Sequence, residues 1–193
     1  KDILSFAGVR KPKKIVDLLT LLALQIGQEV RISELAQNLA ISQKAVENYL
    51  EVLEKMFVLM NLRGFSRNLR KEISKTSKYY FFDVGLRNGL IRNFNALNLR
   101  ADTGGLFENW FIMEKIKAAS IFDRPANFYF WRTYDQQEID LIEERSGKLY
   151  GYEVKWNKAK AKKPLDWFKA YNNSQYEVVN NENYQKFIYE TFF

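Results

Sequence analysis

The sequence predicts an α/β protein of the α+β type, built from two modules, and three observations support this prediction. Residues 1–83 show apolar residues at helical spacing followed by two short apolar runs, whereas residues 84–193 mix helical and strand-like patterns. The positive charge is concentrated in residues 1–100, and the remainder is close to neutral. With 193 residues, 47% of them hydrophobic, the chain can form two small domains. We therefore expect one domain at 1–83 and a second at 84–193.

The first module is predicted to contain a helix-turn-helix. Its expected elements are, in order, a helix at 14–26 stopped by Gly27, a strand at 29–32, a helix at 34–39 capped by Ser33, and a helix at 42–56 capped by Ser42. A short helix, a tight turn and a longer helix are typical of this motif. Apolar runs at 57–62 and 79–82 predict two strands that pair as a wing.

A basic segment joins these two strands. Its cationic residues are Arg63, Arg67, Arg70, Lys71, Lys75 and Lys78. Interleaved with Phe65 and with serine and asparagine, they suit contacts to phosphates, so we predict that they bind nucleic acid, namely DNA. A solvated hairpin loop and a protein-binding wing remain alternatives. The acidic Glu47, Glu51 and Glu54 on the preceding helix would repel phosphates and weaken the DNA interpretation.

The second module alternates helices and strands. Its expected elements are helices at 83–92 and 106–119, strands at 128–132, 138–143 and 149–156, a helix at 164–171 and a strand at 176–179. The segment 144–148 has the composition of a hairpin turn. We expect Trp131 to lie in the core, although it could also contact a substrate.

Several classes of site are excluded by composition. The chain has no cysteine and no histidine, which excludes disulfides, Ser-His-Asp triads and most zinc sites. No GxxxxGK[ST] phosphate loop occurs, so these residues alone are not expected to hydrolyse ATP. No apolar run has membrane-spanning length and no secretory signal is visible, so we expect a cytoplasmic protein without membrane contact. Any catalysis must use carboxylates, lysines or tyrosines.

One set of charged residues in the second module indicates chemistry. Asp140 lies in a predicted strand, and Glu153 and Lys155 lie two residues apart in the next one, so they share a face. Glu108 lies upstream in a predicted helix. If the two strands pair, carboxylates and an ammonium converge in a way that suits a divalent metal beside a phosphodiester. The simpler interpretation is an exposed charge pair, because ExK spacing alone is common.

Together with the order of elements, these residues resemble the PD-(D/E)xK nuclease superfamily. The resemblance implies a restriction-endonuclease-like domain with a central mixed sheet. It also implies that Asp140 and Glu153 bind magnesium, that Lys155 positions or activates the attacking water, and that Glu108 joins the metal shell. These four residues are the predicted catalytic set. The chain has Glu-Ile-Asp where the family motif has Pro-Asp.

A closer resemblance covers nearly the whole chain. It rests on the segments Ile32–Ala36, Ser42–Leu50, Phe65–Asn68, Lys78–Asp83, Phe107–Asn109, Phe130–Arg132 and Tyr152–Lys155. These look like a bacterial and archaeal family of predicted AAA-superfamily ATPases, in the part that follows the ATPase domain. The resemblance implies a winged helix-turn-helix plus the nuclease-like domain, an ATPase domain missing before Lys1, and ATP bound only there.

These observations lead to a leading hypothesis and an alternative. The leading hypothesis is a DNA-associated module of an ATP-driven protein, with magnesium-dependent phosphodiester cleavage; its partners would be DNA and its own ATPase domain. The alternative is a regulatory or interaction domain without catalysis on the same fold. The sequence leaves the oligomeric state open, and an oligomer is compatible with it.

Overall fold

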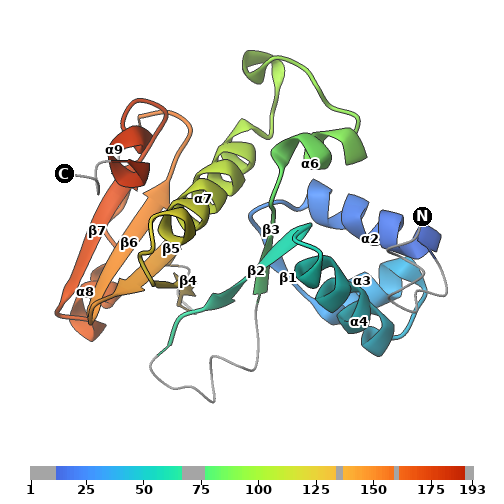
Figure 1. The fold of residues 1–193 in the computed structure, drawn as a ribbon, viewed down its shortest axis with the longest axis horizontal. Coiled ribbons are helices and arrows are strands. Elements are labelled where there is room, and N and C mark those ends of the chain that lie inside the picture. The colour runs from blue at the N-terminus through green and yellow to red at the C-terminus, as the bar shows by residue number, and fades with distance from the viewer. Residues whose placement is uncertain (1–11, 67–76, 134–136, 159–160, 190–193) are drawn as a thin grey trace. The chain divides into compact units, whose positions relative to one another are not determined.

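The computed structural model describes residues 12–66, 77–133, 137–158 and 161–189 (Figure 1). Within these residues the strands form a seven-stranded mixed sheet in the order β1-β3-β2-β4-β5-β6-β7. Contacts divide the chain into two units, residues 1–61 with 76–99 and residues 62–75 with 100–193. The predicted α/β class is confirmed. No helix among the described residues is long and apolar enough to span a bilayer.

Three helices form the larger part of the first unit: α2 (Pro12–Leu24), α3 (Ile32–Leu39) and α4 (Gln43–Lys55). Ala40, with φ 51°, makes the tight turn between α3 and α4. The predicted cap of α4 is confirmed, because Ser42 Oγ accepts a hydrogen bond from the Ala45 amide at 3.2 Å. The predicted cap of α3 is wrong: the helix begins at Ile32, before Ser33, and Arg31 precedes it without a side-chain cap.

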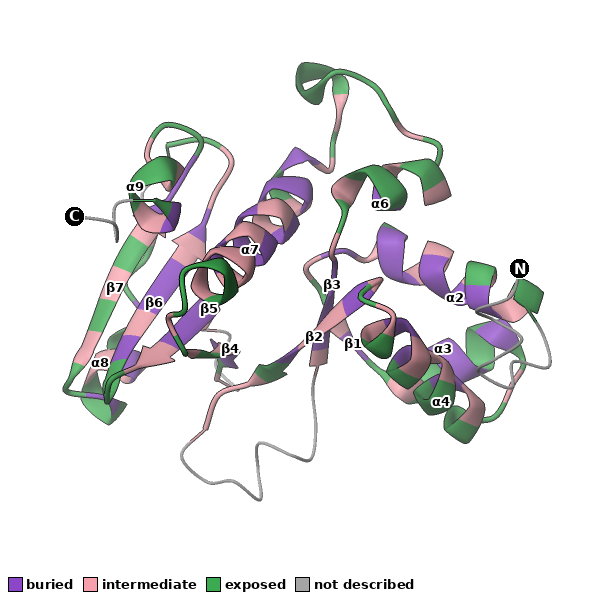
Figure 2. Ribbon diagram, viewed as in Figure 1, coloured by how far each residue is buried: buried purple, intermediate pink, exposed green. Residues whose placement is uncertain are grey.

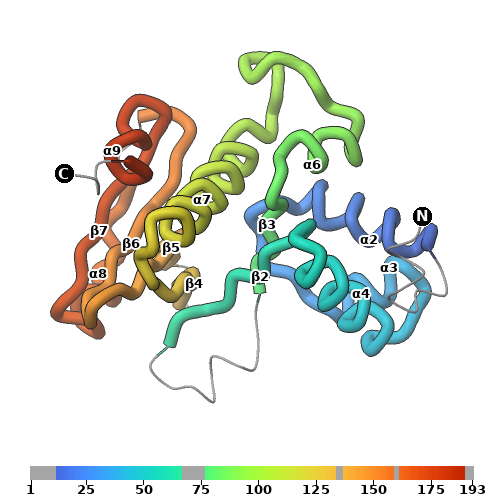
Figure 3. Tube along the Cα trace, in the orientation of Figure 1, coloured from blue at the N-terminus to red at the C-terminus, as the bar shows by residue number. Residues whose placement is uncertain are grey.

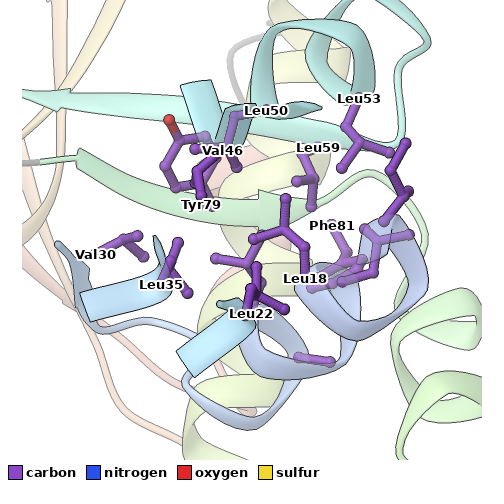
Figure 4. Close-up of a cluster of buried hydrophobic side chains, with 14 of the residues drawn as sticks. Leu18, Leu22, Val30, Leu35, Val46, Leu50, Leu53, Leu59, Tyr79 and Phe81 are labelled. Carbon is purple, nitrogen blue, oxygen red and sulfur yellow. The ribbon is translucent and has the colours of Figure 1, made fainter. Parts of the chain in front are cut away.

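Strands β1 (Glu29–Val30), β2 (Leu59–Gly64) and β3 (Ser77–Phe81) follow the order β1-β3-β2, and β1 is antiparallel to β3. The apolar faces of the helices and of β2 and β3 enclose one core, in which Leu18, Leu50 and Phe81 are at most 1% exposed (Figure 4). This burial is the main stabilising term of the unit.

The first unit extends beyond the expected boundary at residue 83. It includes α6 (Val84–Leu90) and the 3₁₀ turn η1 (Leu97–Leu99). A buried Arg87 connects α6 to α2, since its Nε donates to the Ala23 carbonyl at 2.9 Å. Sequence patterns did not reveal this contact, because an arginine on a short helix is usually exposed.

The second unit contains α7 (Thr103–Ile121), β4 (Asn127–Arg132), β5 (Glu138–Arg145), β6 (Lys148–Val154), α8 (Leu165–Ala170), β7 (Ser174–Val179) and α9 (Tyr184–Ile188). All of these except α9 were expected. Strands β4, β5 and β6 are antiparallel neighbours, whereas β7 is parallel to β6. The last residues of β2 pair in parallel with β4.

Helices cover both faces of the β4–β7 sheet. Helices α7 and α9 lie on one face (Figure 3). Phe111 of α7 packs there against Tyr152 of β6, and Lys115 of α7 donates to the Phe187 carbonyl of α9. On the other face, Trp167 of α8 packs in a cluster with Trp131 and Ile139. Strands β5 and β6 are therefore buried over much of their length (Figure 2). The expectation that Trp131 is a core residue is confirmed.

Candidate functional site

The candidate site forms where β5 and β6 run side by side. Leu141 of β5 lies opposite Tyr152 of β6, so Asp140 and Glu153 occupy the next pair of positions along the antiparallel ladder. Asp140 is only 6% exposed, and its Oδ2 accepts a hydrogen bond from the Val154 amide at 2.8 Å. This bond fixes one aspartate oxygen against the neighbouring strand.

A β-bulge lies at Asp140. Across the β4–β5 ladder, Tyr129 faces Ile142 but Trp131 faces Ile139, so Asp140 and Leu141 together oppose the single residue Phe130. Such an extra residue bends the strand and changes the direction of its side chains, and bulges are frequent next to active sites. The aspartate is thus held at the irregular point of an otherwise regular strand.

Glu153 and Lys155 form an ion pair at the end of β6. Lys155 Nζ lies 2.7 Å from Glu153 Oε1, with 43% of the lysine side chain and 14% of the glutamate side chain exposed. The alternation of a strand places both on one face, as the sequence predicted, while Val154 between them is buried.

The second oxygen of Glu153 has no such partner. Among the described residues, Glu153 Oε2 is buried and accepts no hydrogen bond. A buried, unpaired carboxylate oxygen is costly, because desolvation is not offset by any polar contact. Of the two Glu153 oxygens, Oε1 is paired with Lys155 and Oε2 has no partner among the described residues. The carboxylate of Asp140 lies beside them.

Burial and the neighbouring charged groups shift the pKa values of Glu153 and Lys155. Burial raises the pKa of Glu153, the nearby charge of Asp140 raises it further, and the hydrogen bond from Lys155 only partly offsets both. Burial lowers the pKa of Lys155, but its hydrogen bond to Glu153 and the charges of Asp140, Glu153 and Glu108 outweigh burial and raise it. Lys155 therefore stays charged, and the carboxylate pair favours added positive charge.

Glu108, the third predicted metal ligand, stays a prediction in that role. It lies on α7, half-buried, and its charge acts on Lys155. Within the described ranges no three carboxylates are grouped closely enough to hold one metal ion. The structure thus brings together Asp140, Glu153 and Lys155, with Glu108 within electrostatic reach of the lysine but not grouped as a third ligand.

Aromatic packing holds Glu108 and Lys155 near each other. Phe107, which precedes Glu108, stacks on Trp110 at 5.8 Å and meets the edge of Trp156, the residue after Lys155, at 5.4 Å between ring centroids. Trp110 in turn contacts Tyr184 of α9 at 5.0 Å. These contacts hold α7 next to the end of β6. Each ring pair contributes about 0.5–1.5 kcal/mol to stability.

Tyr176 of β7 is a site residue that the sequence did not reveal. It lies opposite Gly151 in the parallel β6–β7 ladder, two residues before the partner of Glu153. Burial raises the pKa of its phenol, and the charges of Glu153 and Asp140 raise it further. Its position depends on pairing between strands separated by a helix, which strand periodicity does not indicate.

Of the six residues predicted to contact nucleic acid, the structure describes two, Arg63 and Lys78. Arg63 is exposed on β2, while Arg67, Arg70, Lys71 and Lys75 lie outside the described residues. Lys78 is a correction: it is 2% exposed in β3, so its ammonium is not presented at the surface. Phe65 is partly buried and packs against Tyr129, Trp167 and Tyr171, because β2 continues alongside β4.

Comparisons with known proteins identify uncharacterised relatives. Residues 1–97 match the model of a domain of unknown function, DUF8612, and residues 103–191 match that of another, DUF4143. DUF4143 is typically found with AAA-type ATPases. The break between the two matches falls close to the boundary between the two units at Leu99 and Arg100.

Two curated relatives are uncharacterised proteins, one from Mycobacterium bovis and one from Mycobacterium tuberculosis. Each is 33% identical over 138 residues, which cover 70% of this chain but 30% of the relative. The chain therefore spans about a third of the length of these proteins. No solved structure matches it.

Proposed function

We propose that this chain, which belongs to the DUF8612 family, is the DNA-associated part of an ATP-driven protein and cleaves phosphodiesters with the help of magnesium. The observation that carries the proposal is the buried Oε2 of Glu153, which has no hydrogen-bond partner among the described residues and lies beside the carboxylate of Asp140. A buried carboxylate whose pKa is raised by burial and by a second carboxylate nearby, as at Glu153, is suited to a divalent cation between the two.

The order of elements supports the fold within this proposal. In the second unit, α7, the antiparallel β4–β5–β6, α8 and the parallel β7 follow the order of the PD-(D/E)xK core. In the first unit, three helices and the β1-β3-β2 sheet suit a winged helix-turn-helix with β2 and β3 as the wing. In this interpretation Asp140 lies on the second strand, Glu153 lies on the third and Lys155 directly follows that strand, which agrees with the order of the family's motif.

The residues fit the metal. Magnesium prefers oxygen ligands and keeps several waters, so one or two carboxylates can hold it beside a phosphate. Asp140 and Glu153 would hold the cation, which when bound stabilises charge on the attacked phosphate and favours a hydroxide nucleophile. No cysteine or histidine competes for a softer metal.

Besides the two carboxylates, three groups of the chain would contribute to the reaction: Lys155, Glu108 and the Val154 amide. Lys155, kept charged by the surrounding carboxylates, can orient the attacking water or contact the phosphate through its ammonium. Glu108 adds to the field that keeps Lys155 protonated. The Val154 amide holds one oxygen of Asp140 and thereby orients that carboxylate.

Digestion of labelled single-stranded and duplex oligonucleotides, with magnesium or manganese, tests this proposal. Asp140→Asn should reduce cleavage at least 100-fold and Lys155→Ala should reduce it strongly, because each removes a group that acts on the phosphate. The matched controls are Glu177→Gln on β7 and Lys169→Ala on α8, which alter exposed charges of the same types. No cleavage by wild type, or equal cleavage by wild type and Asp140→Asn, contradicts the proposal.

ATP would enter only through a separate domain. The relatives are about three times as long as the matched segment, and DUF4143 typically accompanies AAA-type ATPases. We propose that ATP turnover in such a domain moves or positions the DNA for this unit. An assay of the full-length protein, in which ATP leaves cleavage and DNA affinity unchanged, would count against that coupling.

DNA binding is proposed for Arg63 and for the four basic residues that follow it in the sequence, Arg67, Arg70, Lys71 and Lys75. Phosphate contacts release counterions, so affinity should fall steeply with salt. An affinity for duplex DNA that does not change between low and moderate salt would exclude this role.

A regulatory domain without catalysis is the second candidate, and one observation favours it. The exposed face of α4 carries Glu47 and Glu51, each paired with a lysine, and such a face suits a protein partner better than DNA. Titration of the protein with manganese by calorimetry separates the two candidates. Binding at one site supports the nuclease, and absence of binding supports the regulatory domain.

A further inference from the structure

Two buried polar atoms near the carboxylate pair have no partner in the described part of the chain. One is Glu153 Oε2, which can only accept hydrogen bonds, and the other is the hydroxyl of Tyr176, which can donate one. Buried polar groups are nearly always satisfied, so each such atom requires an explanation. Glu153 Oε2 is an acceptor and the Tyr176 hydroxyl is a donor, and both lie in the site formed by Asp140 and Glu153. One explanation for both atoms is therefore preferable to two separate ones.

The two atoms belong to residues that are close together on adjacent strands. Tyr176 pairs with Gly151, and Val178 pairs with Glu153, so Tyr176 and Glu153 are diagonal neighbours on adjacent strands. Gly151 and Glu153 are two residues apart on β6 and therefore share a face with Tyr176. The phenol ring also contacts Phe168 of α8, at 6.2 Å between ring centroids.

Electrostatics agree with this placement. Both Glu153 and Asp140 act on the phenol and, with burial, keep it protonated. The hydroxyl is therefore a permanent donor close to two carboxylates, yet it donates to neither of them in this structure. A species that satisfies both atoms must bind a carboxylate oxygen and also offer an oxygen to a donor; a hydrated cation meets both requirements.

We infer that Tyr176 is a further residue of the metal site, whose hydroxyl hydrogen-bonds a water of the hydration shell of the cation held by Asp140 and Glu153. This inference rests on the proposed function, since it assigns a role around the same cation. Tyr176 acts through that water, and the carboxylates remain the ligands. Removing an outer-shell partner of this kind typically weakens metal binding or activity about 10- to 100-fold.

Tyr176→Phe tests the inference because it removes only the hydroxyl and leaves the ring on Phe168. The matched control is Tyr150→Phe on the same sheet, whose ring lies by Arg145. The melting temperature of wild type and both variants is measured in EDTA and with manganese, and the manganese dissociation constant by calorimetry.

The expected result has two parts. In EDTA, Tyr176→Phe melts no lower than wild type, because the buried hydroxyl has no hydrogen bond to any described residue. With manganese, the rise in melting temperature is smaller in Tyr176→Phe, whose dissociation constant increases about 10-fold, whereas Tyr150→Phe behaves as wild type.

Two other results would overturn the inference in distinguishable ways. If wild type and Tyr176→Phe gain the same stability and bind manganese equally, the hydroxyl has no role in the site, although the metal site stands. If manganese neither binds to nor stabilises wild type, the metal site fails and the role of Tyr176 fails with it.

Discussion

Two clusters around strands β5 and β6 each include one glutamate, one lysine and one tyrosine, and the hydrogen bonding and ion pairing of their glutamates differ sharply. Around Glu143, both carboxylate oxygens are used: Oε2 accepts from the Tyr152 hydroxyl at 3.0 Å and lies 3.1 Å from Lys115 Nζ, while Oε1 lies 3.5 Å from Arg145. Around Glu153, one oxygen binds Lys155, and both the other oxygen and the Tyr176 hydroxyl are unpaired among the described residues.

This difference separates a structural cluster from a candidate chemical one. Glu143 and Lys115 are 2% and 6% exposed, and Lys115 also donates to the Phe187 carbonyl, so every member is satisfied without a ligand. A saturated cluster fixes α7 and α9 on the sheet but has no capacity left for a substrate. The unsaturated cluster stabilises the apo fold less and retains groups for a ligand.

The largest expected effect comes from breaking the saturated cluster. Lys115→Met removes the partner of a buried carboxylate and should lower the free energy of unfolding by about 3–5 kcal/mol. Lys117→Met, on the same helix and in the half-exposed pair with Glu114, is the control and should cost less than about 1 kcal/mol. Urea unfolding measures both. Equal costs for the two variants would show that the Glu143 cluster has no special structural role.

The second effect concerns the unsaturated cluster. Glu153→Gln removes a charge that repels Asp140, so the metal-free protein should unfold within about 1 kcal/mol of wild type, or at slightly higher denaturant. Manganese affinity should fall at least about 100-fold, which corresponds to roughly 2.7 kcal/mol. Calorimetry and urea unfolding on the same samples check this. A large loss of stability with unchanged metal affinity would reverse the roles assigned to the two clusters.

A smaller effect is expected from pH. The pKa of Glu153 is raised in the folded protein, which therefore binds a proton more tightly than the unfolded chain does. As the pH falls from above the raised pKa of folded Glu153 toward the ordinary pKa of a glutamate, the metal-free wild type should gain stability relative to Glu153→Gln. Above the raised pKa this gain is absent. Manganese binding should weaken over the same window, because protonation competes with the cation. Parallel pH profiles of both proteins would contradict the assignment.

The smallest effect is expected at Gly151, between the two clusters. A Cβ there would lie 3.3 Å from two side-chain atoms of Ile139 and 3.4 Å from the Gln175 carbonyl. Gly151→Ala should therefore cost about 1 kcal/mol of stability through mild overpacking. Urea unfolding measures it, and a variant as stable as wild type would show that Ile139 moves without cost.

The sequence predicted the local structure better than the contacts between elements. Helical spacing identified α2 and α4, and alternation placed Glu153 and Lys155 on one face, because both depend on neighbouring residues. Strand pairing between Asp140 and Glu153 followed from the short turn between β5 and β6.

The errors share a physical cause. Phe65 and Lys78 were expected in a surface loop. Because β2 continues along β4 and β3 lies inside the sheet, Phe65 is partly buried and Lys78 is fully buried. The Glu143 cluster and Tyr176 likewise depend on α7 and β7, which are distant in sequence from their partners. Such long-range contacts leave no periodic signal.

The most direct test of the account is the position of manganese in a soaked crystal, read from its anomalous scattering. The account predicts one peak within bonding distance of Glu153 Oε2 and of a carboxylate oxygen of Asp140, and no peak at Glu143. A peak elsewhere, or none at the pair under saturating manganese, would contradict it.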